Sequence, residues 1–278
     1  LGRLRAGNVR QFAAASTPEG FRWMWNTFGT EEAKERKDRR LIKMRSADNP
    51  HLPPDFISRL EASYDPSLLA AYLQGEFTNL TTGQVYDRFD RNKHICRDLP
   101  DVSDEPIRAG IDFNIGNMSA VIGVRLGNSL LLIDEISGAH DTDALAQEIR
   151  RRFPDRRILA YPDASGAARS TNSSRTDVAI LESYGFSNQS PKSNPPVRDR
   201  VASVQALLEN GKGEVRLQVA AHCKRMIECL ELQSYTEQGE PDKDAGYDHM
   251  NDALGYLVFR EFSILHARAG RGTGIRLY

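Results

Sequence analysis

The stretch Ala109-Gly-Ile-Asp-Phe-Asn-Ile-Gly-Asn-Met-Ser-Ala-Val-Ile-Gly-Val-Arg125 places one acidic residue, Asp112, in an otherwise apolar strand, which a tight turn joins to a second apolar strand. Burying an ionised carboxylate is costly unless another group compensates its charge. We therefore expect Asp112 to bind a metal ion, a phosphate-bearing ligand or a basic partner.

The pattern around this stretch is that of a mixed α/β domain. Residues 107–114, 119–126 and 129–136 are expected to form an antiparallel meander, because glycine-containing turns separate three apolar segments. A helix over residues 141–153, capped by Asp141 or Thr142, then leads to a fourth strand at 157–161. That strand ends at Asp163, and ligands bind at the carboxyl ends of strands in open sheets.

Further elements are expected after Asp163: helices at 176–184, 197–209 and 220–232, a weak strand at 186–190, and a last helix in Tyr247-Asp-His-Met-Asn-Asp-Ala-Leu-Gly-Tyr-Leu-Val-Phe259. In that helix Asp248 and Asp252 are four residues apart and repel each other, and His249 lies on nearly the same side. A cation would remove the repulsion. Asp248 can alternatively be a helix cap, whereas Asp252 lies one turn inside, where capping cannot explain it.

Acidic residues at three distant positions, Asp112, Asp163 and Asp252, are what two-metal phosphodiester hydrolysis needs. Hard oxygen ligands favour two divalent ions, Mg²⁺ or Mn²⁺, and the absence of a Cys/His cluster argues against zinc. The order of elements predicts an RNase H-like mixed sheet flanked by helices. Asp112, on the first strand, is best placed to face both ions.

Composition leaves the ligand open. The 278 residues carry a net charge of -1, so any phosphate-binding surface must be a local patch. We expect it to comprise two arginines of a Gly/Ser/Arg-rich loop and basic residues near the start of the 197–209 helix: Arg169, Arg175, Lys192, Arg198 and Arg200. A solvated surface loop is the alternative.

Three cysteines without CxxC spacing argue against a disulfide framework, and Cys223 and Cys229 are expected to pack as small apolar residues. No apolar run reaches the roughly 18 residues that a membrane span needs, and no signal-peptide pattern begins the chain.

Four regions are expected. Residues 1–87 form a small, mostly helical part with two short helices broken at Asp65-Pro66, residues 88–106 a linker, residues 107–265 the α/β domain, and residues 266–278 a flexible basic tail. The strand-like start of the chain suggests a fragment of a longer protein.

At the motif level the chain resembles the large terminase subunit of tailed bacteriophages. Three acidic motifs carry the resemblance: Gly110-Ile-Asp112, Tyr161-Pro-Asp163 and Tyr247-Asp-His-Met-Asn-Asp-Ala-Leu-Gly-Tyr256. Ala15-Ser-Thr-Pro18 is similar to the coupling motif that ends the terminase ATPase core. The segment that begins at Asn49-Pro-His-Leu-Pro and ends at Gln74-Gly-Glu-Phe77 resembles the connection between the ATPase and nuclease domains. Residues 1–87 would then be the end of an ATPase domain.

The resemblance implies a protein of the host cytoplasm that cuts concatemeric double-stranded viral DNA and acts with a small terminase subunit and a portal protein, without a membrane. By motif position Asp112, Asp163 and Asp252 would ligate metal. Some relatives use a histidine in the last motif, so Asp248 and His249 stay open as ligands. Glu135 is a possible outer-shell acid. Without a G-x-x-x-x-G-K-[ST] motif, we expect the chain to cut but not translocate DNA.

Three alternatives stand beside this hypothesis. The segment from Gly110 to Asn117 also resembles the first phosphate loop of the actin, heat-shock and sugar-kinase ATPases, but the second Asp hairpin and the Gly-Gly adenosine motif are missing. RNase H-like resolvases and transposases are the nearest enzymes. A binding module with purely structural acids is the third, and it predicts that Asp112→Asn leaves DNA cleavage unchanged. The hypothesis we favour is sequence-tolerant, metal-dependent DNA cleavage with salt-sensitive binding.

Overall fold

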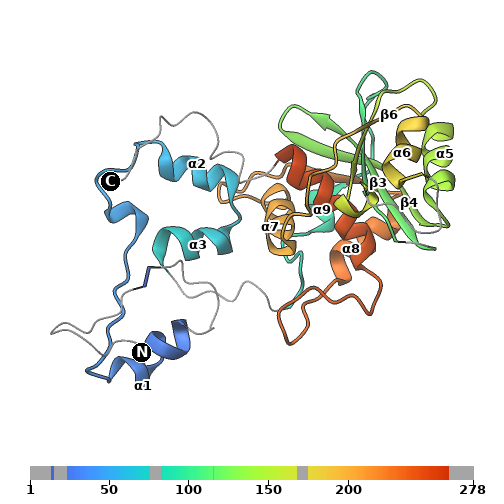
Figure 1. Cartoon of the computed structure of the whole chain (residues 1–278). Helices are drawn as coiled ribbons and strands as arrows, with labels where there is room; N and C mark the ends of the chain where they lie inside the picture. The colour runs from blue at the N-terminus through green and yellow to red at the C-terminus, as the bar shows by residue number, and fades with distance from the viewer. Residues whose placement is uncertain (1–13, 16–23, 76–82, 115, 168–174, 263–278) are drawn as a thin grey trace, which may run out of the picture. The chain divides into compact units, whose positions relative to one another are not determined.

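The computed structural model describes residues 14–15, 24–75, 83–114, 116–167 and 175–262 (Figure 1). The chain divides into two compact units, residues 1–57 with 67–80, and residues 58–66 with 81–278. Arg169 and the expected tail at 266–278 lie outside the described residues. No helix within the described ranges is long and apolar enough to cross a membrane.

The smaller unit is built from short helices: a π-helix η1 (Trp25–Gly29), α1 (Glu31–Lys34), a 3-10 helix η2 (Ser46–Asp48) and most of α3 (Pro66–Gln74). Helix α2 (Phe56–Ser63) runs from this unit into the larger one. The expected break at Asp65-Pro66 is confirmed, since α2 ends before it and Pro66 is the first residue of α3, where its missing N–H costs no hydrogen bond.

In the described part of the larger unit, seven strands form one mixed sheet in the order β1-β7-β4-β3-β2-β5-β6. Their bounds are β1 (Ile95–Cys96), β2 (Ile107–Asp112), β3 (Met118–Leu126), β4 (Ser129–Ala139), β5 (Ile158–Pro162), β6 (Phe186–Asn188) and β7 (Leu217–Ala220). The predicted meander is confirmed, because β2, β3 and β4 pair antiparallel, while β5 runs parallel beside β2. The predicted RNase H-like mixed sheet is therefore the observed fold.

Helices cover both faces of this sheet (Figure 1). On one face α5 (Thr142–Arg152) and α6 (Asp177–Ser183) pack against a core that includes Ile107, Ala109 and Ile111 of β2. On the other face α7 (Val197–Leu208), α8 (Lys224–Leu232) and α9 (Asp248–Phe262) share a second core with β3, β4 and β7. Asp141 caps α5 as predicted, by accepting a hydrogen bond of 2.8 Å from the Ala144 N–H.

Helix α9 lies along β2 because Gly110 has no side chain. A Cβ atom there would stand 2.2 Å from the Ala253 carbonyl oxygen and 3.0 Å from Leu257 Cβ. Arg108, two residues earlier on the same face of β2, reaches Glu261 near the end of α9 at 3.4 Å. Asp112, two residues later, meets the first turn of α9. The glycine thus lets α9 approach the strand that carries Asp112.

Two parts of the sheet were not predicted. Residues 88–106, expected as a linker, contain α4 (Arg91–His94) and β1, which pairs with β7. The helix expected from residue 220 begins at Lys224, because residues 217–220 form β7 beside β4. Both strands are short and lie at or near one edge of the sheet, so they carry little periodic signal. Cys223 and Cys229 are free and buried, as predicted.

Candidate functional site

Asp112 and Asp163 are neighbours at the carboxyl ends of two parallel strands. Ile111 of β2 pairs with Pro162 of β5, and the Asp163 N–H donates to the Ile111 carbonyl oxygen at 3.2 Å. Both acids are buried, with 8% and 7% of their surface exposed. The structure thus brings the first two predicted acids together.

Asp163 is held by the turn that follows it. Its Oδ1 accepts hydrogen bonds from the Ser165 N–H at 2.8 Å, the Ser165 hydroxyl at 2.6 Å and the Gly166 N–H at 3.3 Å. This turn, the 3-10 helix η3 (Ala164–Ala167), packs on the Phe113 ring, since a Cβ on Gly166 would stand 2.1 Å from a ring carbon. The small residues of the loop therefore fix the carboxylate beside β2.

The first turn of α9 contributes His249 and Asp248. His249 Nδ1 lies 3.1 Å from Asp112 Oδ2 and 3.8 Å from Asp248 Oδ2. Its other ring nitrogen, Nε2, lies 2.9 Å from the Asn114 amide nitrogen. Asp248 is 6% exposed, and its Oδ1 is buried without a hydrogen-bond partner. Such an atom is rare in folded proteins and marks a position where another group can bind.

Asp252 pairs with a basic residue of helix α7. Its Oδ1 lies 2.8 Å from Nη1 of Arg200, a residue that is only 5% exposed and whose guanidinium stacks 4.4 Å over the Tyr256 ring. The N–H direction is not aligned for a hydrogen bond, so the contact is an ion pair. Asp252 therefore already has a cation within the chain, which explains how a carboxylate is tolerated inside this helix.

The site is short of positive charge. Burial and the nearby Asp252 carboxylate raise the pKa of Asp112 to about 6, with a smaller contribution from Asp163 and with His249 opposing the shift. Burial also raises the pKa of Asp252, although Arg200 and Lys243 oppose it. Lys243 had no signal in the sequence, because it lies in the polar segment before α9.

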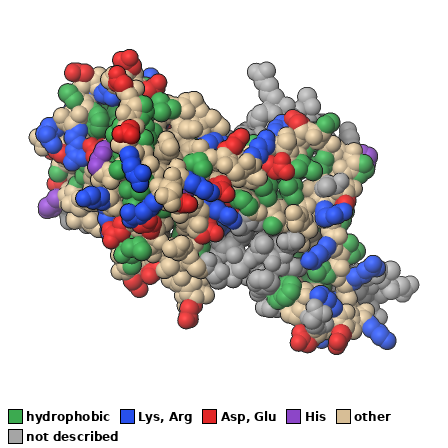
Figure 2. Space-filling view, turned by 180° about the vertical axis from the view of Figure 1, so that it is seen from behind, with side chains coloured by type: hydrophobic (Ala, Val, Ile, Leu, Met, Phe, Trp, Pro, Cys, Tyr) green, Lys and Arg blue, Asp and Glu red, His purple; other side chains and the backbone are tan. Residues whose placement is uncertain are grey.

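The predicted phosphate contacts fall into two groups. Arg175, Lys192 and Arg198 are exposed, whereas Arg200 is buried against Asp252. The segment that carries Lys192 lies near the acids, because the Asn194 amide oxygen accepts a hydrogen bond of 2.6 Å from the Ala164 N–H, directly after Asp163. Figure 2 shows basic and acidic side chains interspersed over the face in view, so basic residues there do not form a surface of one sign.

Glu135, which the sequence offered as an outer-shell acid, binds the start of helix α8. Its two carboxylate oxygens accept hydrogen bonds from the backbone N–H groups of Arg225 and Met226, at 2.9 and 2.7 Å. These are the free donors at the start of α8, whose N-cap residue Cys223 makes no side-chain cap bond. Glu135 is a helix cap supplied by a strand.

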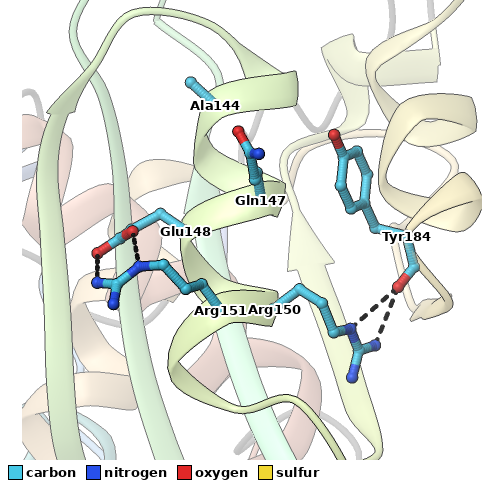
Figure 3. A pocket seen from close by; sticks show the side chains of 6 residues that line it. All are labelled: Ala144, Gln147, Glu148, Arg150, Arg151 and Tyr184. Atoms are coloured by element: carbon cyan, nitrogen blue, oxygen red, sulfur yellow. Dashed lines mark hydrogen bonds and ion pairs between the residues drawn. The ribbon is translucent and has the colours of Figure 1, made fainter.

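An open groove of about 530 Å³ lies along α5 and Tyr184, at the face of the sheet opposite α9 (Figure 3). Its arginines are already bonded: Arg150 donates to the Tyr184 carbonyl oxygen at 3.0 and 3.2 Å, and Arg151 pairs with Glu148 at 2.7 Å. We therefore assign the groove no role in the site.

The acidic site suits hard divalent cations, which prefer carboxylate oxygens. The chemistry of its donors and the unpartnered, buried Asp248 Oδ1 both fit such an ion. Among the described residues, no three His, Cys, Asp or Glu side chains already surround one point closely enough to hold an ion. The donors converge at the strand ends without closing into a cage.

Comparison with known proteins agrees with the fold and the motifs. The family model described as the terminase RNaseH-like domain matches residues 109–261, and the one described as the N-terminal part of the T4likevirus-type terminase large subunit matches residues 2–93. No curated protein sequence matches the chain.

Solved structures share the fold at low sequence identity. The large terminase of a thermophilic bacteriophage, in complex with ADP, is 18% identical, with a TM-score of 0.66 over 88% of this chain and 60% of that one. The nuclease domain of the P22 large terminase is 15% identical, with a TM-score of 0.52 over 69% of this chain and 100% of that one. The chain thus spans about 60% of the length of the thermophilic phage protein.

Proposed function

Since the chain belongs to the terminase large subunit family, whose RNaseH-like domain it contains, we propose that it is a metal-dependent endonuclease that cuts concatemeric double-stranded viral DNA during genome packaging. The observation that carries this proposal is the meeting of Asp112, Asp163 and His249 at one edge of the sheet. By family we also propose a small terminase subunit and a portal protein as partners, and the host cytoplasm as the place of action.

We assign the metal ligands as Asp112, Asp163 and His249, with Asp248 next to them. His249 replaces Asp252 as the preferred third ligand, because its Nδ1 lies 3.1 Å from Asp112 whereas Asp252 is paired with Arg200. Two divalent ions, Mg²⁺ or Mn²⁺, would supply activation of the attacking water and stabilisation of the leaving oxygen.

The chain's own residues prepare the site for that chemistry. The turn after β5 fixes the Asp163 carboxylate through three donors. The buried surroundings of Asp112 strengthen its attraction for any cation, because the effective dielectric constant is low there. The Asp112 carboxylate also contacts the imidazole of His249, so both side chains lie where a cation would bind.

DNA contacts are proposed from the exposed basic residues Arg175, Lys192 and Arg198, together with Arg169. Phosphate contacts of this kind make affinity fall steeply with salt. The tie between Asn194 and Ala164 supports a role for Lys192, since it keeps that segment next to Asp163. Arg200 is proposed to reach phosphate only if it leaves Asp252.

Plasmid nicking tests the proposal directly. Wild-type protein is expected to nick and linearise supercoiled plasmid with Mn²⁺ or Mg²⁺ and to leave it intact with EDTA. Asp112→Asn and His249→Ala should abolish cutting, while Asp104→Asn, which removes one exposed carboxylate elsewhere, should not. Metal-dependent cutting that survives Asp112→Asn would disprove the assignment.

A further inference from the structure

Helix α8 is bonded to the segment that leads into α9. The guanidinium of Arg225, in the first turn of α8, donates to the Gly246 carbonyl oxygen at 2.7 Å and lies 5.1 Å over the Tyr247 ring. The two residues that follow Tyr247 are Asp248 and His249, which both belong to the acidic site. Arg225 thus holds the chain immediately before these two side chains.

Arg225 is itself held on a fixed support. Three apolar residues of α8, Met226, Ile227 and Leu230, are buried in the core that the helix shares with the sheet. One turn along the helix, the Glu228 carboxylate accepts a hydrogen bond of 2.6 Å from the Arg225 guanidinium. Because a guanidinium is planar and its donors form a rigid fork, this bond also fixes the direction of the remaining donors.

The segment before α9 is a tight surface turn. The Gly246 N–H donates to the Lys243 carbonyl oxygen at 3.1 Å, and residues 243–245 are exposed. Gly246 has a φ of +68°, a left-handed conformation that favours glycine. Exposed turns and helix ends open at a low cost in free energy, so a contact with a fixed helix strongly limits their motion.

A second contact joins the first turn of α9 to the far end of α8. Asn251 is 2% exposed, and its amide donates to the Cys229 carbonyl oxygen and to the Gln233 side-chain oxygen, both at 2.8 Å. The first turn of α9 is therefore attached to α8 at two points, one within the turn and one just before it.

We propose that Arg225 is a positioning residue for the metal site. By holding Gly246 and Tyr247 it fixes the start of α9, and so keeps His249 directed toward Asp112. The part that concerns metal rests on the proposed function, whereas the hold on the start of α9 concerns the metal-free protein alone. Residues that orient ligands without touching the metal typically set its affinity by about 10- to 100-fold.

The first test is hydrogen exchange of the full chain in EDTA, followed by mass spectrometry of the peptide that covers residues 243–251. Exchange in this peptide should be faster in Arg225→Ala than in wild type and closer to wild type in Arg225→Lys, which keeps a donor for the Gly246 carbonyl. Arg91→Ala is the matched control. It also removes an arginine bonded to α8, since Arg91 donates to Glu231 at 2.7 Å, and it should leave exchange there unchanged.

The second test is Mn²⁺ binding to the same proteins. Calorimetry should show an affinity about 10- to 100-fold lower in Arg225→Ala, a smaller loss in Arg225→Lys and the wild-type value in Arg91→Ala. Pulsed EPR of bound Mn²⁺ should show the nitrogen coupling of the His249 imidazole in wild type, weakened in Arg225→Ala and absent in His249→Ala. A residue that only stabilised the fold would not weaken this signal.

Exchange at residues 243–251 that stays at the wild-type rate in Arg225→Ala would overturn the inference. Faster exchange with wild-type Mn²⁺ affinity and an unchanged nitrogen signal would overturn it too, because the contact would then not position the ligands. Wild-type protein that binds no Mn²⁺ would instead refute the proposed function, and the exchange measurement would still decide whether Arg225 holds the start of α9.

Discussion

Replacing Asp112 by asparagine is expected to stabilise the metal-free protein while abolishing its proposed cleavage. Asp112 is only 8% exposed, and its pKa is raised from 3.8 to about 6 by burial and by the Asp252 carboxylate. The folded state therefore binds this proton more tightly than the unfolded chain does. As the pH rises from about 4 through 6, the unfolded chain releases this proton before the folded protein does. Burial and the Asp252 carboxylate disfavour the ionised form in the folded state, so the folded state loses stability.

The size of the effect follows from the shift. About two pKa units, at about 1.4 kcal/mol each, mean that the ionised carboxylate costs the folded state about 3 kcal/mol above pH 7. About half of that cost is felt at pH 5, where the unfolded chain is ionised and the folded protein is not. An amide has nearly the same shape and no charge, so Asp112→Asn should recover these amounts.

Urea unfolding in EDTA at pH 5 and pH 8 measures this difference. Asp112→Asn is expected to exceed wild type by about 3 kcal/mol at pH 8 and by about half as much at pH 5. Asp104→Asn controls for the loss of an exposed charge and should match wild type at both pH values. Mn²⁺ should then stabilise wild type but not Asp112→Asn. A variant no more stable than wild type at pH 8 would refute the reasoning.

Three other substitutions follow from packing and pairing. Gly110→Ala should lower the free energy of unfolding by about 1–3 kcal/mol in urea titrations and reduce plasmid nicking, because its Cβ would displace α9. Glu135→Ala should lower stability by about 1–2 kcal/mol through loss of the α8 cap and leave the Mn²⁺ affinity unchanged; a weakened affinity would restore Glu135 to the metal site. Arg200→Met, by leaving the buried Asp252 carboxylate without its cation, should cost about 3–5 kcal/mol in urea titrations, and the double variant with Asp252→Asn should recover most of it; simple additivity would contradict a coupled pair.

The part of the fold that the sequence predicted is the part with strong local signals. The meander of β2 to β4 has apolar runs and glycine turns, and α5 has a capping aspartate and regular apolar spacing. The same signals predicted that Asp112 and Asp163 lie close together, because the carboxyl ends of neighbouring parallel strands lie at the same end of the sheet. Strands β1 and β7 span only 95–96 and 217–220. Such short segments become strands through pairing, β7 with β4 and β1 with β7, and this pairing leaves no signal in the local sequence.

The third element of the site could not be chosen from spacing alone. Asp248, His249 and Asp252 occupy one turn of a helix, and spacing leaves open which side of that turn faces the sheet. The side of α9 that faces the sheet is set at Gly110, because the missing side chain lets Ala253 pack directly on β2. Lys243, whose charge opposes the rise in the Asp252 pKa, carries no motif signal, because it lies in a polar segment without periodic spacing.

Packing of α9 on β2 decides the roles of its acidic residues. Adjacent residues in a helix point about 100° apart, so with Ala253 against β2, Asp252 must point to the side of the helix. That side faces α7, where Gly255 and Tyr256 also contact Arg200. His249, one turn before Ala253, points back toward the strand and meets Asp112. A substitution at residue 110 that moved the helix would therefore change both pairs together, and separate changes in the His249 and Arg200 contacts would show that α9 is not one rigid support for the site.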